Sequence, residues 1–332
     1  MGLRGSAAGY PGLRPGFAAV FTIEVPIPAQ ASYLFLRAVE QGPNQYAIES
    51  ADDLRGPWAP AAGAVLILVP ATSGLAPGSA EAQQQQLNAA AAAALPLEAE
   101  NTAGMRFRLI PAGTFAMGAA PGEAGAESDE APVHTVTINK SLWVGTCEVT
   151  QGQWKTVMGS DPSRFAGDSR RPVEQVNWNQ CIGFIQKLNQ REGGGYRLLT
   201  EAEWEYACRA GTGTPFYAGS APSDLDRAAW YWSTSGHFSH PVGGKTPNAW
   251  GLYDMLGNVA EWVEDDYFIS YSNAPADGTA RMKDPRHWVR VQRGGGWASV
   301  PSRTRSAARF GDHRDFSSYV TGLRLARDVT AP

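Results

Sequence analysis

The sequence predicts an α+β fold with much irregular structure, preceded by a small β-rich module. The chain contains 37 glycines and 23 prolines among its 332 residues, which favours turns and loops over long helices. Segments with apolar residues at every second position indicate strands, and three helix-start motifs indicate short helices. With 43% hydrophobic residues and 11 tryptophans, the chain can bury a sizeable core.

The β-rich module is expected within residues 1–70. Its segments "SYLFLRAV" and "QYAIESA" alternate apolar and polar residues, and "AVLILVP" is a further apolar run. Residues 71–101 change to alanine, glutamine, glycine and proline, with almost no apolar stripe beyond alanine. We interpret residues 71–101 as a linker that is partly helical.

Residues 102–328 have the pattern of a folded domain. "MRFRLIPAGTFAMG" predicts two strands around a Pro-Ala-Gly turn, and "HTVTINKSLWVGTCEVT" alternates again. Capping-box patterns predict helices that begin after Thr150, Asn177 and Thr200. The second helix has an apolar face that contains Cys181 and ends at "EGGG", so this cysteine is expected in the core.

Charge and cysteine content exclude several classes of protein. The net charge of −4 does not favour nucleic-acid binding, and the basic segment 281–327 is expected to pair its arginines with acids elsewhere. The named candidates for this pairing are Glu261, Glu264, Asp265 and Asp266. Three cysteines without a CxxC motif predict neither a disulfide framework nor a structural zinc site.

Targeting signals in the sequence are weak. No stretch reaches the ~18 apolar residues of a membrane span. The segment "FAAVFTIEVPIPAQAS" is only weakly similar to a signal peptide, because Glu24 falls inside its apolar part. Location inside or outside the cytoplasm is therefore left open. Separately, the protein is expected to be a monomer.

Six motifs occur in a fixed order along residues 104–328. They are "MRFRLIPAGTFAMG", "CEVTQGQWKTVMG", "PVEQVNWNQC", "YRLLTEAEWEYACRAG", "NAWGLYDMLGNVAEW" and "RVQRGGGW…RSAARF…GLRLAR". Together they resemble the formylglycine-generating enzyme (sulfatase-modifying factor) domain family. The resemblance implies a C-type-lectin-like fold, with a few helices packed on twisted antiparallel strands.

The resemblance also exposes a departure from the oxidising enzymes of that family. Those enzymes bind copper through two cysteines that follow the glycine–aromatic motif. Here Ser299 stands at the first position, the second falls in a shortened segment between Ser302 and Arg305, and no cysteine follows Cys208. Copper(I) requires soft thiolate ligands, which a serine hydroxyl does not replace. Copper and formylglycine-generating oxidase activity are therefore not expected.

A structural calcium ion is the cofactor that the resemblance implies. Asp254, Gly257, Val259 and Glu261 match positions where the family holds calcium, and calcium takes six to eight carboxylate and carbonyl oxygens. The alternative is that Asp254 and Glu261 pair with arginines such as Arg305. His237 and His240 are expected to be ordinary loop residues.

Two function classes remain open after these observations. One is a non-catalytic module that binds a protein or glycan on a lectin-like scaffold. The other is a metal-dependent oxidoreductase of the same superfamily with a non-thiol site, acting on a protein or a small molecule. The binding interpretation draws on a further resemblance, to variable proteins of diversity-generating retroelements, whose variable segment is C-terminal.

The binding interpretation predicts a recognition surface near the C-terminus. Its mixed aromatic, small and charged residues are typical of recognition surfaces. The glycines 294–296 are expected to bring backbone close to its neighbours, with Trp297 as an anchor in the core. The predicted ligand-binding residues are Ser299, Arg303, Phe310, Asp312, His313, Phe316 and Tyr319.

Overall fold

The computed structural model describes residues 35–42, 45–51, 59–60 and 78–329. The chain divides into two compact units, residues 1–70 and 71–332. The first unit contains an antiparallel sheet of β1 (Phe35–Gly42), β2 (Gln45–Ala51) and β3 (Ala59–Pro60), in the order β1-β2-β3. Strand β1 overlaps the first alternating segment of the sequence, and β2 coincides with the second. The apolar run 64–70 lies outside the described residues.

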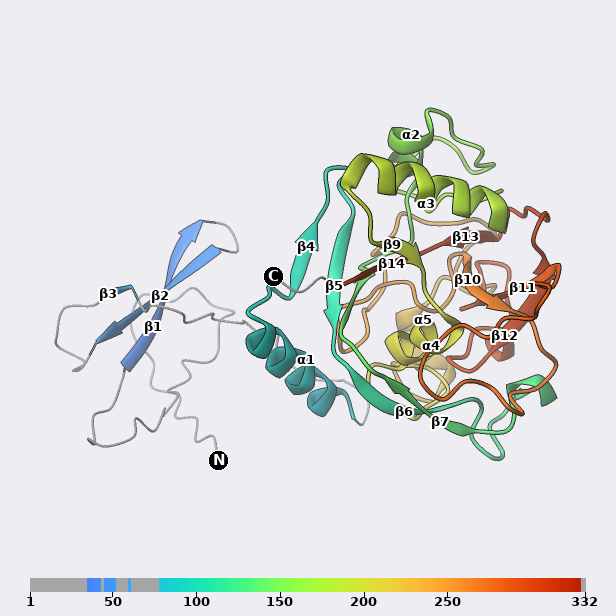
Figure 1. The fold of residues 1–332 in the computed structure, drawn as a ribbon, viewed down its shortest axis with the longest axis horizontal. Coiled ribbons are helices and arrows are strands. Elements are labelled where there is room, and N and C mark those ends of the chain that lie inside the picture. The colour runs from blue at the N-terminus through green and yellow to red at the C-terminus, as the bar shows by residue number, and fades with distance from the viewer. Residues whose placement is uncertain (1–34, 43–44, 52–58, 61–77, 330–332) are drawn as a thin grey trace. The chain divides into compact units, whose positions relative to one another are not determined.

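The expected linker 71–101 is, over its described part, an ordered piece of the second unit. Helix α1 (Ser79–Ala93) lies beside the strands of the domain, and β4 (Glu98–Glu100) pairs with β5 (Arg106–Ile110) (Figure 1). The amide of Gln86 donates to the carbonyls of Leu109 and Trp250 at 2.8 and 3.2 Å. Alanine and glutamine provide this packing without an apolar stripe, because a small side chain allows close approach and a buried amide finds backbone partners.

Three sheets form the scaffold of the second unit. A five-stranded sheet has the order β4-β5-β8-β14-β9, a four-stranded sheet the order β12-β11-β10-β13, and β6 pairs with β7. Strand β13 runs parallel to β10, and the other pairings are antiparallel. The remaining strands are β6 (Gly113–Met117), β7 (His134–Ile138), β8 (Leu142–Gly145), β9 (Tyr196–Leu198), β10 (Ala260–Asp266), β11 (Val289–Arg293), β12 (Arg309–His313), β13 (Thr321–Leu323) and β14 (Leu325–Asp328).

The two strands predicted around the Pro-Ala-Gly turn, β5 and β6, belong to different sheets. The turn at 111–113 does not form a hairpin. Instead it carries the chain from the five-stranded sheet, where β5 pairs with β8, to the two-stranded sheet, where β6 pairs with β7. The alternating pattern identified the strands but carried no signal for their partners.

The helices begin where the capping boxes predicted. Thr150, Asn177 and Thr200 each accept a hydrogen bond from the backbone three residues later, and that residue's side chain reaches back. They precede α2 (Gln151–Met158), α3 (Trp178–Glu192) and α4 (Glu201–Arg209). Helix α3 buries Cys181 as predicted and ends at Gly193, whose φ is 85°. A further helix, α5 (Pro222–Ala228), and two 3-10 turns, η1 (Ser128–Glu130) and η2 (Pro301–Arg303), complete the elements of the described residues.

The predicted α+β fold with much irregular structure is confirmed. Helix α4 lies at the centre of the second unit, between the sheets (Figure 1). Its residues Trp204, Ala207 and Cys208 belong to a continuous hydrophobic core with Trp250 and Leu252. Long irregular segments connect the elements, and they carry the loops described below. Among helices in the described ranges, none has the length and apolar character required to cross a membrane.

Candidate functional site

The glycine triplet brings backbone against backbone, as the sequence predicted. Gly294 and Gly295 have φ values of 86° and 67°. A Cβ on Gly294 would lie 2.9 Å from the Met255 carbonyl oxygen, and one on Gly295 would lie 2.5 Å from the Arg303 carbonyl oxygen. Both the conformation and the space therefore require glycine at these positions.

Trp297 follows the triplet and joins four segments of the chain. Its side chain is buried, and its ring N–H donates to the Tyr319 carbonyl at 3.0 Å. Its own carbonyl accepts from the Ser235 hydroxyl at 2.9 Å. Its ring stacks on Tyr319 at 5.7 Å and meets the edge of Phe165 at 5.5 Å. The predicted anchor thus fixes the positions of loops that are distant in sequence.

Exposed and half-buried side chains from the segments around this anchor form what we call the Trp297 surface. Arg164, Trp232, His237 and Tyr319 are exposed, and Phe165 and Ser299 are half-buried. The side chain of Tyr319 is 38% exposed, and that of Trp232 is 53% exposed. The guanidinium of Arg164 lies 4.8 Å from the centre of the Tyr319 ring. The backbone N–H of Trp232 donates to the Ser299 carbonyl at 3.0 Å, and its ring contacts His237 at 4.4 Å.

The predicted ligand-binding residues fall into three groups rather than one. Ser299 and Tyr319 belong to the Trp297 surface. Arg303 lies over the half-buried ring of Phe310 at 4.9 Å and pairs with Glu127 at 3.0 Å. His313 stacks on the exposed ring of Trp288 at 5.9 Å.

Strand geometry explains part of this separation. Phe310 and Asp312 are half-buried residues of β12, and they alternate with exposed Gly311 and His313. Successive side chains of a strand point to opposite faces, so Phe310 and His313 are directed to different sides. Phe316, at 51% exposure, follows in the turn after β12.

The sequence interpretation missed Arg164, Phe165, Trp232 and Trp288. They lie in three separate segments, upstream of the C-terminal stretch on which the prediction concentrated. A basic residue next to an aromatic residue in "SRF", within a loop of turn-forming residues, was the signal available for the first two. Nothing in the spacing of these segments predicted that those of Phe165 and Trp232 meet at Trp297, or that Trp288 meets His313.

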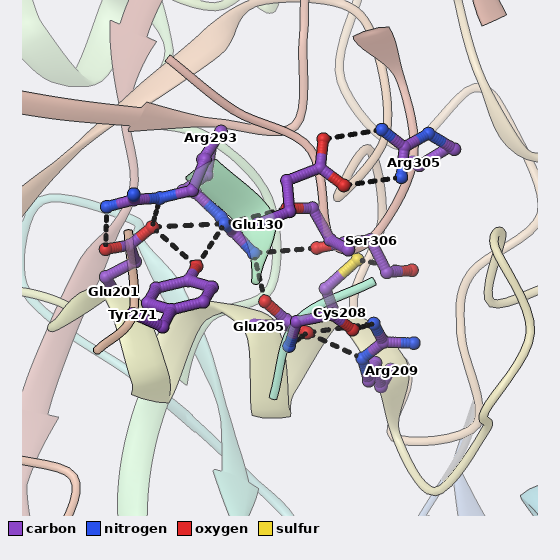
Figure 2. A network of polar contacts seen from close by, with 12 residues as sticks. Glu130, Glu201, Glu205, Cys208, Arg209, Tyr271, Arg293, Arg305 and Ser306 are labelled. Atoms are coloured by element: carbon purple, nitrogen blue, oxygen red, sulfur yellow. Dashed lines mark hydrogen bonds and ion pairs between the residues drawn. The ribbon is translucent and has the colours of Figure 1, made fainter. Parts of the chain in front are cut away.

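A network of buried ion pairs holds the segment that carries the site (Figure 2). Arg293 contacts Glu201 at 3.1 Å and donates to the Ser306 carbonyl at 2.7 Å. Arg305 binds both carboxylate oxygens of Glu130, at 2.6 and 2.8 Å. These four side chains are buried. The predicted pairing of the basic segment with acids is therefore seen, with Glu130 and Glu201 as partners that the sequence did not name.

The acids that the sequence did name are mostly paired as expected. Arg324 binds Glu261, Arg286 binds Glu264, and both Arg286 and Arg290 contact Asp266. Asp265 differs. Its two oxygens accept backbone N–H groups, those of Glu201 at 2.7 Å and Arg281 at 2.6 Å.

The three cysteines are not poised as thiolates. Cys147, Cys181 and Cys208 are free thiols. Burial raises the pKa of both Cys147 and Cys208 to about 12, and it raises the pKa of Cys181 as well. At the position of the family's first cysteine, the Ser299 hydroxyl accepts the Gly296 N–H at 3.0 Å within a turn. The donor set at this place does not fit copper(I).

The predicted calcium residues lie in a buried turn that precedes and enters β10. The carboxylate of Glu261 pairs with Arg324 at 2.8 Å and accepts the Trp204 ring N–H at 2.6 Å. Asp254 accepts the Gly243 N–H at 2.6 Å, and its second oxygen has no hydrogen-bond partner in the described residues. Asp254 thus offers a free ligand oxygen, whereas at Glu261 a cation would face Arg324. Calcium at this turn stays a prediction.

His237 and His240 contact aromatic rings. His240 stacks on Trp230 at 3.8 Å, and burial lowers its pKa. His237 contacts Trp232, as described above. Within the described residues, no group of three or more His, Cys, Asp or Glu side chains is arranged to hold a metal ion.

Comparison with known proteins identifies the family to which the domain is similar. The family model of the sulfatase-modifying factor enzyme 1-like domain matches residues 92–329. Among curated proteins, the chain is 30% identical over 214 residues to the chaperone protein LppX of Paenibacillus barcinonensis, covering 49% of this chain and 71% of LppX.

Two solved structures share both fold and sequence similarity. PvdO from Pseudomonas aeruginosa is 30% identical with a TM-score of 0.66, covering 70% of this chain and 98% of PvdO. Treponema denticola variable protein 1 is 29% identical with a TM-score of 0.63, covering 70% of this chain and all of that protein. The match to the family model spans well over half of the sequence, and the chain therefore belongs to the family of sulfatase-modifying factor enzyme 1-like domains.

Proposed function

We propose that the protein is a non-catalytic binding module and that the Trp297 surface is its recognition site. One observation carries this proposal: the exposed residue Trp232 binds the backbone of Ser299, which stands at the position of the oxidising relatives' first cysteine, and Trp297, two residues earlier, supports the ring of Tyr319 under the Arg164 guanidinium. Tyr319 and Trp232 expose 38% and 53% of their side chains. Aromatic rings give a large contact area at low entropic cost, and they are enriched among residues that dominate binding.

The Trp297 surface is separate from the buried arginine–acid pairs that stabilise the domain, which we call the framework. The buried arginines 293, 305 and 324 stabilise the domain through buried acids. The Trp297 surface adds no member to this network. Residues on it are therefore free to differ between proteins of one fold, as recognition requires. The names of two similar proteins, a chaperone and a variable protein, are consistent with binding.

The ligand is proposed to be a protein or a glycan. A metal-dependent oxidoreductase remains the alternative that family membership implies, and no geometry in the described residues favours it. A stacked guanidinium such as that of Arg164 keeps its N–H donors available at the edge, where they can pair with a carboxylate or a backbone carbonyl.

Binding screens with matched variants test the proposal. The intact protein is applied to a glycan array and to a displayed peptide library, and hits are measured again with Trp232→Ala and Tyr319→Ala. Trp288→Ala is the matched control, because Trp288 is 56% exposed but belongs to the His313 group. We expect the first two variants to lose at least tenfold in affinity with little change in melting temperature.

Two results would contradict the proposal. The first is binding that Trp288→Ala abolishes while Trp232→Ala and Tyr319→Ala retain it, since the site would then lie elsewhere. The second is oxidation of a sulfatase-type cysteine peptide to an aldehyde, measured by peptide mass, with loss of the product on copper chelation.

A further inference from the structure

We propose that Glu174 is a protonation-controlled positioning residue of the Trp297 surface. Its buried carboxyl group holds the turn 161–166 in place, and ionisation of this group releases the turn and uncovers Trp297 and Tyr319. The consequence for ligand binding rests on the proposed function. The release itself is a property of the fold and is measured without a ligand.

Only one of the two carboxyl oxygens of Glu174 has a hydrogen-bond partner in the described residues. The side chain has no solvent-accessible surface. One oxygen accepts the Phe165 N–H at 2.7 Å, and the other has no hydrogen-bond partner in the described residues. Among the described residues, no arginine or lysine side chain donates a hydrogen bond to the Glu174 carboxyl group. A buried carboxylate with an unpartnered oxygen is costly, so such a group either keeps its proton or gains access to water.

The turn held by Glu174 is the edge of the recognition surface. The N–H of Glu174 donates to the Ser163 hydroxyl at 3.3 Å, so the residue binds the turn at two points. The ring of Phe165 meets the edges of Trp297 at 5.5 Å and Tyr319 at 6.4 Å. Arg164 lies over Tyr319. Movement of this turn therefore changes what the surface presents.

The turn lies between two fixed segments. Before it, α2 ends at Gly159, whose N–H donates to the Lys155 carbonyl at 2.8 Å. After it, the Ser169 carbonyl accepts the Gly152 N–H and the Gln175 N–H donates to the Ser318 carbonyl, both at 2.9 Å, and Gln175 has a φ of 62°. A left-handed conformation in a residue other than glycine is strained and is retained where the surroundings impose it. Within the turn, the Phe165 carbonyl also accepts the side-chain amide of Gln151 at 3.2 Å, whereas Arg164 is exposed.

The charges around Glu174 do not compensate for its burial. Burial raises the pKa of Glu174 to about 7, although backbone N–H groups of Phe165 and Arg164 lower it. Asp161 raises this pKa further and Arg164 lowers it. Other charged or titratable groups on the segments packed here are Asp168, Arg170, Arg171, Arg314 and Tyr319.

The direction of the pH effect follows from the difference in the pKa of Glu174 between the docked and the released turn. In the docked turn the pKa of Glu174 is about 7, whereas in a released, solvated state it returns to its ordinary value near 4.5. The released state therefore binds the proton less tightly, and raising the pH from 4.5 to 7 favours release. The upper limit of the change in the opening equilibrium is about 300-fold, since each pKa unit corresponds to a factor of ten.

Hydrogen exchange at the Phe165 amide measures the opening directly. Exchange is followed in the intact protein from pH 5 to pH 8, with correction for the intrinsic rate at each pH. We expect the opening constant to rise at least tenfold over this range. In Glu174→Gln, which cannot ionise but still accepts the Phe165 N–H, it should stay flat. The Cys181 amide, bonded to Asn177 within α3, is the control that should show no trend in either protein.

Two results would overturn the inference: a flat opening constant in the native protein, or equal slopes in the native protein and Glu174→Gln. If the variant does not fold, the native protein alone decides the matter through NMR titration of the Glu174 side-chain carbonyl carbon. A midpoint near 7 supports the inference, and a midpoint below 5 overturns it. Failure of the ligand screens would leave both measurements interpretable.

Discussion

Replacing Arg293 by methionine should destabilise the domain strongly, because this residue is at the centre of the buried network (Figure 2). Its guanidinium has no exposure and contacts Glu201 at 3.1 Å and Glu205 at 2.5 Å. It also donates to the carbonyls of Ser306 and Ala307 at 2.7 and 3.2 Å. Methionine fills a similar volume but leaves two buried acids and two carbonyls with fewer partners.

The expected loss of stability depends on the ion-pair partners that Glu201 and Glu205 retain in the variant. Glu201 keeps Arg309 at 2.7 Å, and Glu205 keeps Arg209 at 2.8 Å. Burial raises the pKa of Glu205, but Arg209 and Arg293 outweigh it and hold the pKa below its ordinary value. Removing one partner of a buried ion pair costs about 3–5 kcal/mol. Because one arginine remains for each acid, we expect about 3 kcal/mol, which is roughly 6–12 °C in melting temperature for a domain of this size.

Urea unfolding, followed by circular dichroism, is the assay. Arg303→Met is the matched control, since Arg303 lies in the same segment but is 46% exposed, with a partner, Glu127, that is 51% exposed. An exposed pair of this kind contributes about 0–1 kcal/mol. Equal losses in the two variants, or a loss below about 1 kcal/mol for Arg293→Met, would refute the reasoning that the network is the main support of this segment.

Three further outcomes are expected. Gly295→Ala should lower stability by at least about 1–3 kcal/mol, measured by urea unfolding, because it adds a Cβ 2.5 Å from the Arg303 carbonyl oxygen at a positive φ; a neutral substitution would show that the segment relaxes freely. Calcium at a hundredfold excess over its dissociation constant should stabilise the protein by about 2.7 kcal/mol, and Asp254→Asn should remove this shift; identical melting curves in calcium and chelator would remove the site. A copper-supplied reaction with a sulfatase-type cysteine peptide should give no aldehyde by mass, since the residue at the position of the first family cysteine is Ser299.

The sequence predicted local structure well where the interaction that determines the structure joins residues only a few positions apart. The capping boxes at Thr150, Asn177 and Thr200 involve only the next turn of backbone, so the helix starts were readable. The glycine triplet signalled close backbone contact, which the positions of Gly294 and Gly295 confirm. Such signals do not depend on knowing which segments become neighbours.

Long-range arrangement was predicted less well, for a physical reason. The linker interpretation of 71–101 judged α1 by its weak apolar stripe, but Gln86 secures the helix through buried hydrogen bonds to carbonyls that are distant in sequence. In the same way, the predicted recognition residues were chosen from one contiguous stretch. The observed surface combines Arg164, Trp232 and Tyr319, because their loops meet at Trp297.

On the proposed function, the contrast between buried arginines and exposed rings would let the domain keep its stability while residues of its exposed surface differ between proteins. The framework gains its support from charge pairs that water does not reach, so substitutions at exposed positions such as Tyr319 or Trp232 are expected to change stability little. Glu174 is the exception to this separation. It is buried like the framework, yet its carboxyl group binds the backbone of an exposed turn and has an unpartnered oxygen. We therefore expect a change in pH to act on recognition through this residue without unfolding the domain.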